Sequence, residues 1–153
     1  MIRLRTFSKG YGLAGARVGY AITNPDLALA FDKVRDNFGM TRISQAGAFA
    51  ALADQTWLVE VHAQVIAARK RLSGIATANG LRPLPSATNF VTIDCGRDGD
   101  HARALLAQIT ARGVFVRMPG VAPLDRCVRV SVADAGALDV FEEILPEALV
   151  AVG

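Results

Sequence analysis

The chain has few residues of the kinds that build disulfide scaffolds, membrane spans or metal clusters. Its only two cysteines, Cys95 and Cys127, are too far apart for a C-x-x-C metal or redox motif. The longest stretch without proline or a polar side chain is residues 46–53, well short of the ~20 apolar residues that a membrane helix needs. Arg3 and Arg5 stand where a secretory signal would need its apolar stretch. We therefore expect a cytoplasmic protein with reduced thiols, no metal and no membrane partner.

The sequence also lacks a concentrated cluster of positive charge. The net charge is +3, but residues 1–76 carry ten Lys or Arg against five acids, whereas residues 77–153 carry seven against nine. The longest basic run is Arg69-Lys70-Arg71, and no aromatic residues are interleaved with it, so a nucleic-acid partner is not expected. Lysine is scarce. The only candidate amine nucleophiles are Lys9, Lys33 and Lys70.

A composition of 52% hydrophobic and 20% charged residues predicts a folded globular chain. Its first part reads as two strands, at residues 1–7 and 17–22, and a series of helices. A helix begins at Asn24-Pro25, and a long helical region covers residues 44–79 with a joint at residues 54–56. Asn79-Gly80 ends this region and prolines follow, so we place a domain boundary there, between residues 1–80 and 81–153.

The second part has the pattern of a small α+β domain. Pro146 is expected to kink its last helix or to divide it into two pieces. The predicted elements are a strand at 89–95, a helix at 101–112, strands at 114–117 and 127–132, and a helix at 136–150.

A glycine-rich segment follows the first strand and permits two interpretations. Gly10, Gly12 and Gly15 satisfy G-x-G-x-x-G, the phosphate-binding turn of dinucleotide folds, and Asp32 stands about where a ribose-binding acid would lie. That motif requires a buried apolar strand before it and a helix after it. The preceding strand is instead rich in cations, and the residues after Gly15 look like a strand. The dinucleotide interpretation is therefore the weaker one.

The second interpretation rests on Ser8, Lys9 and Arg17, which flank the same turn. A hydroxyl, an amine and a guanidinium together suit a cofactor with an aldehyde and a phosphate, because the amine forms a Schiff base and the other two bind the phosphate. The alternative is a surface lysine beside an arginine held in an ordinary ion pair.

The segment Ser8-Lys9-x-x-Gly12-Leu13-Ala14-Gly15-x-Arg17-x-Gly19-Tyr20 closely resembles the lysine motif of class I/II pyridoxal-phosphate (PLP) aminotransferases, especially the histidinol-phosphate aminotransferase-like branch. The resemblance implies an α/β, fold-type I structure comprising the end of the large domain, a linking helix and the small domain. It also implies that Lys9 holds PLP as an internal aldimine and moves the substrate proton, and that Ser8 and Arg17 bind the cofactor phosphate.

Arg129 stands in the middle of the apolar strand 127–132, where an arginine needs an anionic partner. That partner could be Asp125 or Asp134 in an intramolecular ion pair. The resemblance instead implies that Arg129 binds the substrate α-carboxylate.

Two further positions carry weaker implications. The resemblance makes Arg117 a ligand for a phosphate on the substrate side chain. Asn89, in Ala87-Thr88-Asn89-Phe90, fits structural capping as well as substrate contact.

The resemblance covers only the later portion of a family member. The upstream portion supplies the aspartate at the pyridine nitrogen and the ring that stacks on the cofactor. The leading hypothesis is an aminotransferase portion that moves an amino group between an amino acid or histidinol phosphate-like amine and a 2-oxo acid, in a homodimer. The alternatives are a non-catalytic association module and a threonine-phosphate decarboxylase-like enzyme. An uncovered face and edge at the first strand predict association or poor solubility.

Overall fold

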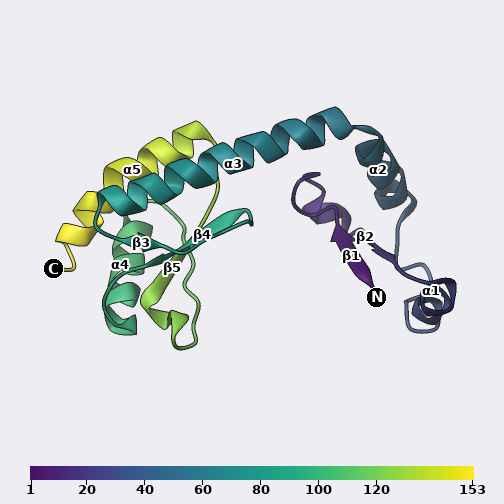
Figure 1. Cartoon of the computed structure of the whole chain (residues 1–153), viewed down its shortest axis with the longest axis horizontal. Helices are drawn as coiled ribbons and strands as arrows, with labels where there is room; N and C mark the ends of the chain where they lie inside the picture. Colours follow the sequence, from purple (N-terminus) through teal and green to yellow (C-terminus); the bar gives the residue numbers. More distant parts are fainter. The chain divides into compact units, whose positions relative to one another are not determined.

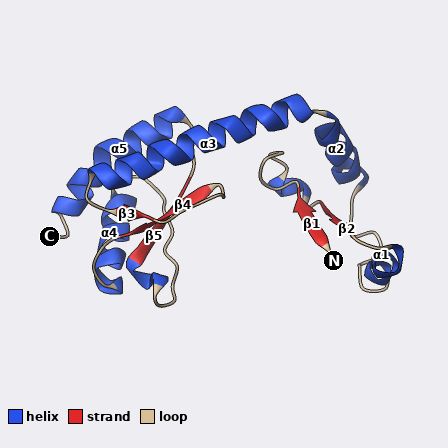
Figure 2. Ribbon diagram, viewed as in Figure 1, coloured by secondary structure: helices blue, strands red, loops and turns tan.

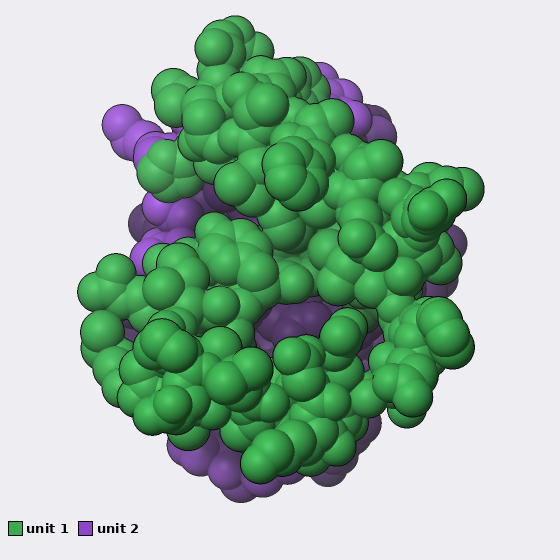
Figure 3. Space-filling view, turned by 90° about the vertical axis from the view of Figure 1, so that its right-hand side faces the viewer, with its two compact units in different colours: residues 1–62 green, residues 63–153 purple.

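The computed structural model describes residues 1–153 and shows a mixed α/β chain divided into two compact units, Met1–His62 and Ala63–Gly153 (Figures 1 and 3). The division falls within the long helix α3 (Gln55–Ala78), whereas the sequence analysis placed a boundary just beyond its end. The difference arises because the end of α3 contributes Leu72, Ile75 and Ala76 to the core of unit 2. The assignment of domains to residues 1–80 and 81–153 stays a prediction.

Unit 1 is built around a short antiparallel hairpin (Figure 2). Strand β1 (Arg3–Thr6) pairs with β2 (Gly19–Ile22), and a single 3-10 turn, η1 (Ala14–Ala16), lies between them. Helices α1 (Pro25–Asp32) and α2 (Arg42–Ala53) follow. The predicted strands are confirmed, with shorter bounds.

Side-chain caps explain where the helices of unit 1 begin. The Asn24 carboxamide oxygen accepts a hydrogen bond from the Leu27 amide at 2.9 Å, and Pro25 occupies the first turn. The joint predicted at residues 54–56 is confirmed, since α2 ends at Ala53 and Asp54 separates it from α3. The Asp54 carboxylate then accepts from the Trp57 amide at 3.0 Å, in the first turn of α3.

Unit 1 has very little core of its own. Phe7 and Val18 are its only buried hydrophobic residues, and a shallow apolar cavity beside them is lined by Tyr20, Phe49 and Leu52, among others. Phe49 is 85% exposed. A two-stranded sheet with so little buried area is marginal in water. The small buried core of unit 1 therefore supports the prediction that its apolar surface associates with another polypeptide segment, and this association stays a prediction.

Gly19 is required by the close approach of the two strands, because a Cβ there would lie 2.6 Å from the Arg5 carbonyl oxygen. We expect Gly19→Ala to destabilise the hairpin by about 1–3 kcal/mol, since the clash is with backbone that cannot rotate away. Hydrogen exchange of the Phe7 amide, which donates to the Val18 carbonyl, measures this. Gly15→Ala is the matched control because its Cβ would meet nothing within 4 Å. Equal exchange in the two variants would contradict the prediction.

Unit 2 packs helices on one face of a three-stranded antiparallel sheet of order β3-β4-β5. Its strands are β3 (Arg82–Pro83), β4 (Phe90–Asp94) and β5 (Cys127–Ser131), and its further helices are α4 (Gly99–Ala111), η2 (Leu124–Arg126) and α5 (Ala135–Val150). Val91 pairs with Val130 and Ile93 with Val128, and these side chains join the core with the helices. The other face, called here the open face, carries Phe90, Thr92 and Asp94 of β4 and Cys127, Arg129 and Ser131 of β5.

One prediction about unit 2 was wrong, and so was one of the two alternatives for Pro146, the division of the last helix. Residues 114–117 form no strand, only an isolated bridge between Arg117 and Arg129. Beyond Arg117 the ladder cannot extend because Pro119, at the next bonding position, has no amide hydrogen. Pro146 lies inside one continuous helix, α5, rather than dividing it. Pro146 has no amide hydrogen to donate to the Glu142 carbonyl. The helix tolerates this loss because both residues are exposed, so water can bond that carbonyl instead.

No helix combines the length and apolarity needed to cross a membrane. No three His, Cys, Asp or Glu side chains are grouped so that they could hold a metal ion.

Candidate active site

The turn between β1 and β2 brings together three residues that the sequence singled out. The Phe7 amide donates to the Val18 carbonyl at 3.2 Å, which extends the hairpin by one pair beyond β1 and β2. Ser8 follows Phe7 on one arm of the hairpin and Arg17 precedes Val18 on the other, so the two residues flank the base of the turn. Lys9 follows Ser8 directly. The turn is closed by a 2.9 Å hydrogen bond from the Gly12 amide to the Lys9 carbonyl.

The backbone of this turn is fixed by unusual dihedral angles. Gly12 has a φ of 70°, which favours glycine, and Arg17 has a φ of 51°, which is uncommon for a residue with a side chain. The Arg17 guanidinium donates to the Ala14 carbonyl at 2.7 Å and makes no ion pair within the chain, whereas Lys9 is exposed, as the alternative of a surface lysine requires. Strain held in this way is typical of functional turns.

Lys9 is exposed, as are Gly12 and Arg17, and its ammonium makes no hydrogen bond or ion pair within the chain. The next residue, Gly10, is closely packed, because a Cβ at Gly10 would lie 3.0 Å from the Leu58 Cδ1 atom. The lysine nitrogen is therefore available to a ligand.

The dinucleotide interpretation is wrong. It required a helix after the third glycine, whereas the chain makes the single 3-10 turn η1 and then enters β2, antiparallel to β1.

Arg117 and Arg129, in unit 2, form the second group of predicted site residues. Their backbones exchange two hydrogen bonds, from the Arg117 amide at 3.0 Å and from the Arg129 amide at 2.6 Å. Directly opposed residues of an antiparallel pair project to the same face, so the two guanidinium groups share the open face. The alternative partners of Arg129 are not used, because Asp125 makes no ion pair and Asp134 caps α5 by accepting from the Ala137 amide. Two cations without a carboxylate partner form a surface suited to an anion.

Asp94 is the buried acid that the sequence analysis missed. Only 3% of it is exposed, and its carboxylate accepts from Arg126 Nε and Nη2 at 2.9 and 2.7 Å and from Arg82 Nη2 at 2.6 Å. The Gly96 amide donates to it as well, at 2.9 Å. The hydrogen bonds from Arg126, opposed by burial and assisted by Arg82, hold the pKa of Asp94 well below its usual range. A single acid within an apolar strand was the available sequence signal.

We expect Asp94→Asn to lower the free energy of unfolding at pH 7 by about 2–4 kcal/mol, because charge-assisted hydrogen bonds to two arginines are lost. The folded pKa lies below the unfolded value of ~4, so the carboxylate stabilises the fold above that pH and loses its effect as the pH falls below it. Urea unfolding of both proteins at pH 7 and pH 3 measures this. A gap between the two proteins that persists undiminished at pH 3 would contradict the charge-based account.

The two cysteines are both free and buried. Burial raises the pKa of Cys95 to about 11 and raises the pKa of Cys127 as well. Both thiols are therefore protonated and unreactive near neutral pH.

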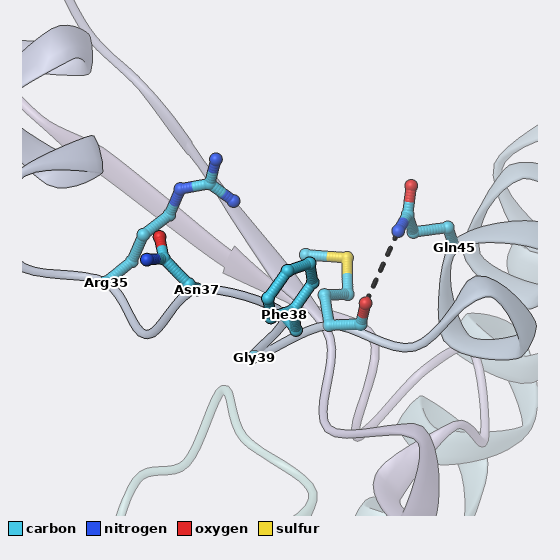
Figure 4. Close-up of a pocket in the computed structure, with 6 residues that line it drawn as sticks. Arg35, Asn37, Phe38, Gly39 and Gln45 are labelled. Atoms are coloured by element: carbon cyan, nitrogen blue, oxygen red, sulfur yellow. Dashed lines mark hydrogen bonds between the residues drawn. The ribbon is translucent and has the colours of Figure 1, made fainter.

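Another surface cavity of unit 1 contains none of the predicted site residues (Figure 4). It is formed by the loop between α1 and α2, where Phe38 is 99% exposed, and the Gln45 carboxamide donates to the Met40 carbonyl at 3.4 Å.

Comparison with known proteins agrees with these features. The structure matches that of histidinol-phosphate aminotransferase from Sinorhizobium meliloti in complex with pyridoxal-5'-phosphate, with a TM-score of 0.95 and 52% identity over 99% of this chain and 42% of that one. The fold is thus an α/β portion of a fold-type I aminotransferase. The sequence profile of aminotransferase class I and II matches residues 1–143, and the chain belongs to that family.

Curated relatives show the same partial coverage. Histidinol-phosphate aminotransferase from Bacillus velezensis is 39% identical over 93% of this chain and 38% of its own length. Aromatic amino acid aminotransferase from Rhodococcus jostii is 38% identical over 92% of this chain and 37% of its own length. The chain therefore spans about two fifths of the length of these relatives. A likeness to L-threonine-O-3-phosphate decarboxylase from Porphyromonas gingivalis, at 19% identity and a TM-score of 0.76, shows the fold alone.

Proposed function

We propose that this chain supplies the cofactor lysine, the phosphate-binding turn and the substrate-binding arginines of a PLP-dependent aminotransferase. The observation that carries the proposal is the strained turn that holds Ser8, Lys9 and Arg17 together in a member of the class I and II family.

The donor set of the turn fits pyridoxal 5'-phosphate. Ser8 offers a hydroxyl and Arg17 offers guanidinium N–H groups, both suited to phosphate oxygens. Lys9 offers an amine that makes no contact within the chain. When bound, the cofactor supplies an electron sink that stabilises negative charge at the substrate Cα.

The chain's own residues then have three tasks. Ser8 and Arg17 hold the phosphate, so that the cofactor keeps one position while its ring chemistry proceeds. The Lys9 nitrogen would hold the cofactor between turnovers and, as a free amine, would take the proton from the substrate Cα and deliver it to the cofactor carbon that carried the aldehyde. Gly12 and the left-handed Arg17 fix the backbone from which these side chains project.

Arg129 binds the α-carboxylate of the amino acid or 2-oxo acid in this proposal. Arg117 binds a second anionic group on the substrate side chain, such as the phosphate of a histidinol phosphate-like amine. Neither arginine is neutralised by an acid of the chain. We also propose that the working enzyme is a homodimer in the cytoplasm.

The function is tested with a chimera in which this chain replaces the corresponding 42% of the Sinorhizobium meliloti enzyme. With PLP, an amino acid and a 2-oxo acid, the chimera is expected to form the new amino acid and the new 2-oxo acid in equal amounts. Release of carbon dioxide in place of a 2-oxo acid would favour the decarboxylase alternative. A folded chimera with neither reaction would favour the association module.

A further inference from the structure

The open face of unit 2 holds a guanidinium against an aromatic ring. The Cζ atom of Arg129 lies 4.9 Å from the centroid of the Phe90 ring, within the range of a cation–π contact. Both residues are half-buried. Arg129 has no carboxylate within ion-pair distance, and the Phe90 ring is the aromatic face that its guanidinium contacts.

The strand register places these two residues together. Phe90 pairs with Ser131 and Thr92 pairs with Arg129, so Phe90 and Arg129 are diagonal neighbours on the same face of the sheet. Diagonal neighbours in an antiparallel pair are within reach of aromatic and long side chains. On its other side, Arg129 is fixed by the two backbone hydrogen bonds to Arg117.

The position of Phe90 is itself fixed by hydroxyl groups in the segment before β4. The Phe90 carbonyl accepts from Ser86 Oγ at 2.6 Å and from Thr88 Oγ1 at 3.2 Å, and the Phe90 amide donates to Thr88 Oγ1 at 3.3 Å. Arg69 donates to the Thr88 carbonyl at 2.9 Å. The Asn89 side chain makes no hydrogen bond, so the capping that the sequence suggested for Asn89 falls to Ser86 and Thr88.

Charge on the open face is arranged so that Arg129 stays unneutralised. The one acid of this face, Asp94, is occupied by Arg82 and Arg126. A carboxylate beside Arg129 would compete with a carboxylate ligand, whereas the face of a ring orients a guanidinium without cancelling its charge.

We propose that Phe90 is a positioning residue for Arg129, holding the guanidinium in the orientation that receives the carboxylate of the amino-acid or 2-oxo acid substrate. This inference rests on the role that the proposed function gives to Arg129. It adds a residue that touches neither cofactor nor substrate.

The test uses the chimera labelled with ¹⁵N, and pyruvate as the probe. The Nε–Hε signal of Arg129 is assigned by its loss in Arg129→Lys. In Phe90→Leu, which keeps an apolar side chain but removes the ring, this signal is expected to lose its ring-current shift, and pyruvate binding is expected to weaken about three- to tenfold. Phe90→Tyr is expected to restore both. Phe49→Leu is the matched control, because Phe49 is an exposed phenylalanine of α2 in unit 1 and its ring contacts no arginine.

The possible failures are distinguishable. An Arg129 signal and a pyruvate affinity that are unchanged in Phe90→Leu would overturn the positioning role and leave the proposed function standing. The same result follows if Phe90→Tyr binds as weakly as Phe90→Leu while the amide spectrum of both stays native. A folded wild-type chimera that does not bind pyruvate at all would overturn the role of Arg129 and the inference with it.

Discussion

Lys9→Ala is expected to lower the transamination rate of the chimera by about 1,000-fold or more. In the proposal Lys9 both carries the cofactor and moves the Cα proton, and general acid–base catalysis alone contributes about 10²–10⁴-fold. The amine makes no contact within the chain, so its removal leaves no buried group unpaired and the fold is expected to remain intact. The rate of the half-reaction with a single amino acid measures the loss directly.

The other two lysines of the chain provide the controls. Lys33 and Lys70 are both exposed, and neither makes a side-chain hydrogen bond or ion pair. Lys33→Ala and Lys70→Ala are therefore expected to keep the wild-type rate. A Lys9→Ala variant that still transaminates at a comparable rate would remove Lys9 from the catalytic role.

Arg129→Lys is expected to weaken substrate binding by about 2–4 kcal/mol, which corresponds to about 30- to 900-fold in affinity. Lysine keeps the positive charge but cannot make two parallel hydrogen bonds to a carboxylate. Because Arg129 makes no ion pair within the chain, the loss falls on ligand binding rather than on the stability of the sheet. The Michaelis constants for both the amino acid and the 2-oxo acid in the chimera should rise.

Arg103→Lys is the matched control for this substitution. Arg103 is an exposed arginine of α4 that pairs with Asp100 one turn earlier, and exposed pairs of this kind contribute little. Unchanged Michaelis constants and normal turnover in Arg129→Lys would exclude Arg129 from the site. A fall in turnover alone, without weaker binding, would assign it a different role.

Much of the candidate site could be predicted because its signals are local. The glycines and the Ser8-Lys9 pair lie close together in sequence, and a turn between two strands brings Arg17 back beside them, although Ser44 of α2 also holds the turn by donating to the Ala16 carbonyl at 2.6 Å. Helix boundaries were predictable for the same reason, since Asn24, Asp54 and Asp98 each cap a helix through the amide three residues later.

The contacts that depend on strand register could not be predicted in the same way. Asp94 meets Arg126 only because β4 and β5 are antiparallel in one register, and the sequence offered Asp125 and Asp134 as equally reasonable acids for Arg129. The contact between Phe90 and Arg129 has the same origin. The bridge of Arg117 to Arg129 was mistaken for a full strand because residues 114–116 have strong β propensity, and only the pairing shows that a single residue of the segment is bonded to β5.

The central claim is that the Lys9 nitrogen holds the cofactor, and one measurement tests it most directly. The chimera is incubated with PLP, reduced with borohydride, digested, and its peptides are weighed by mass spectrometry. The account predicts one pyridoxyl adduct within this chain, on the peptide that contains Lys9, and none on the peptides that contain Lys33 or Lys70. A folded protein with no adduct in this chain, or with the adduct on either of the other two lysines, would contradict it.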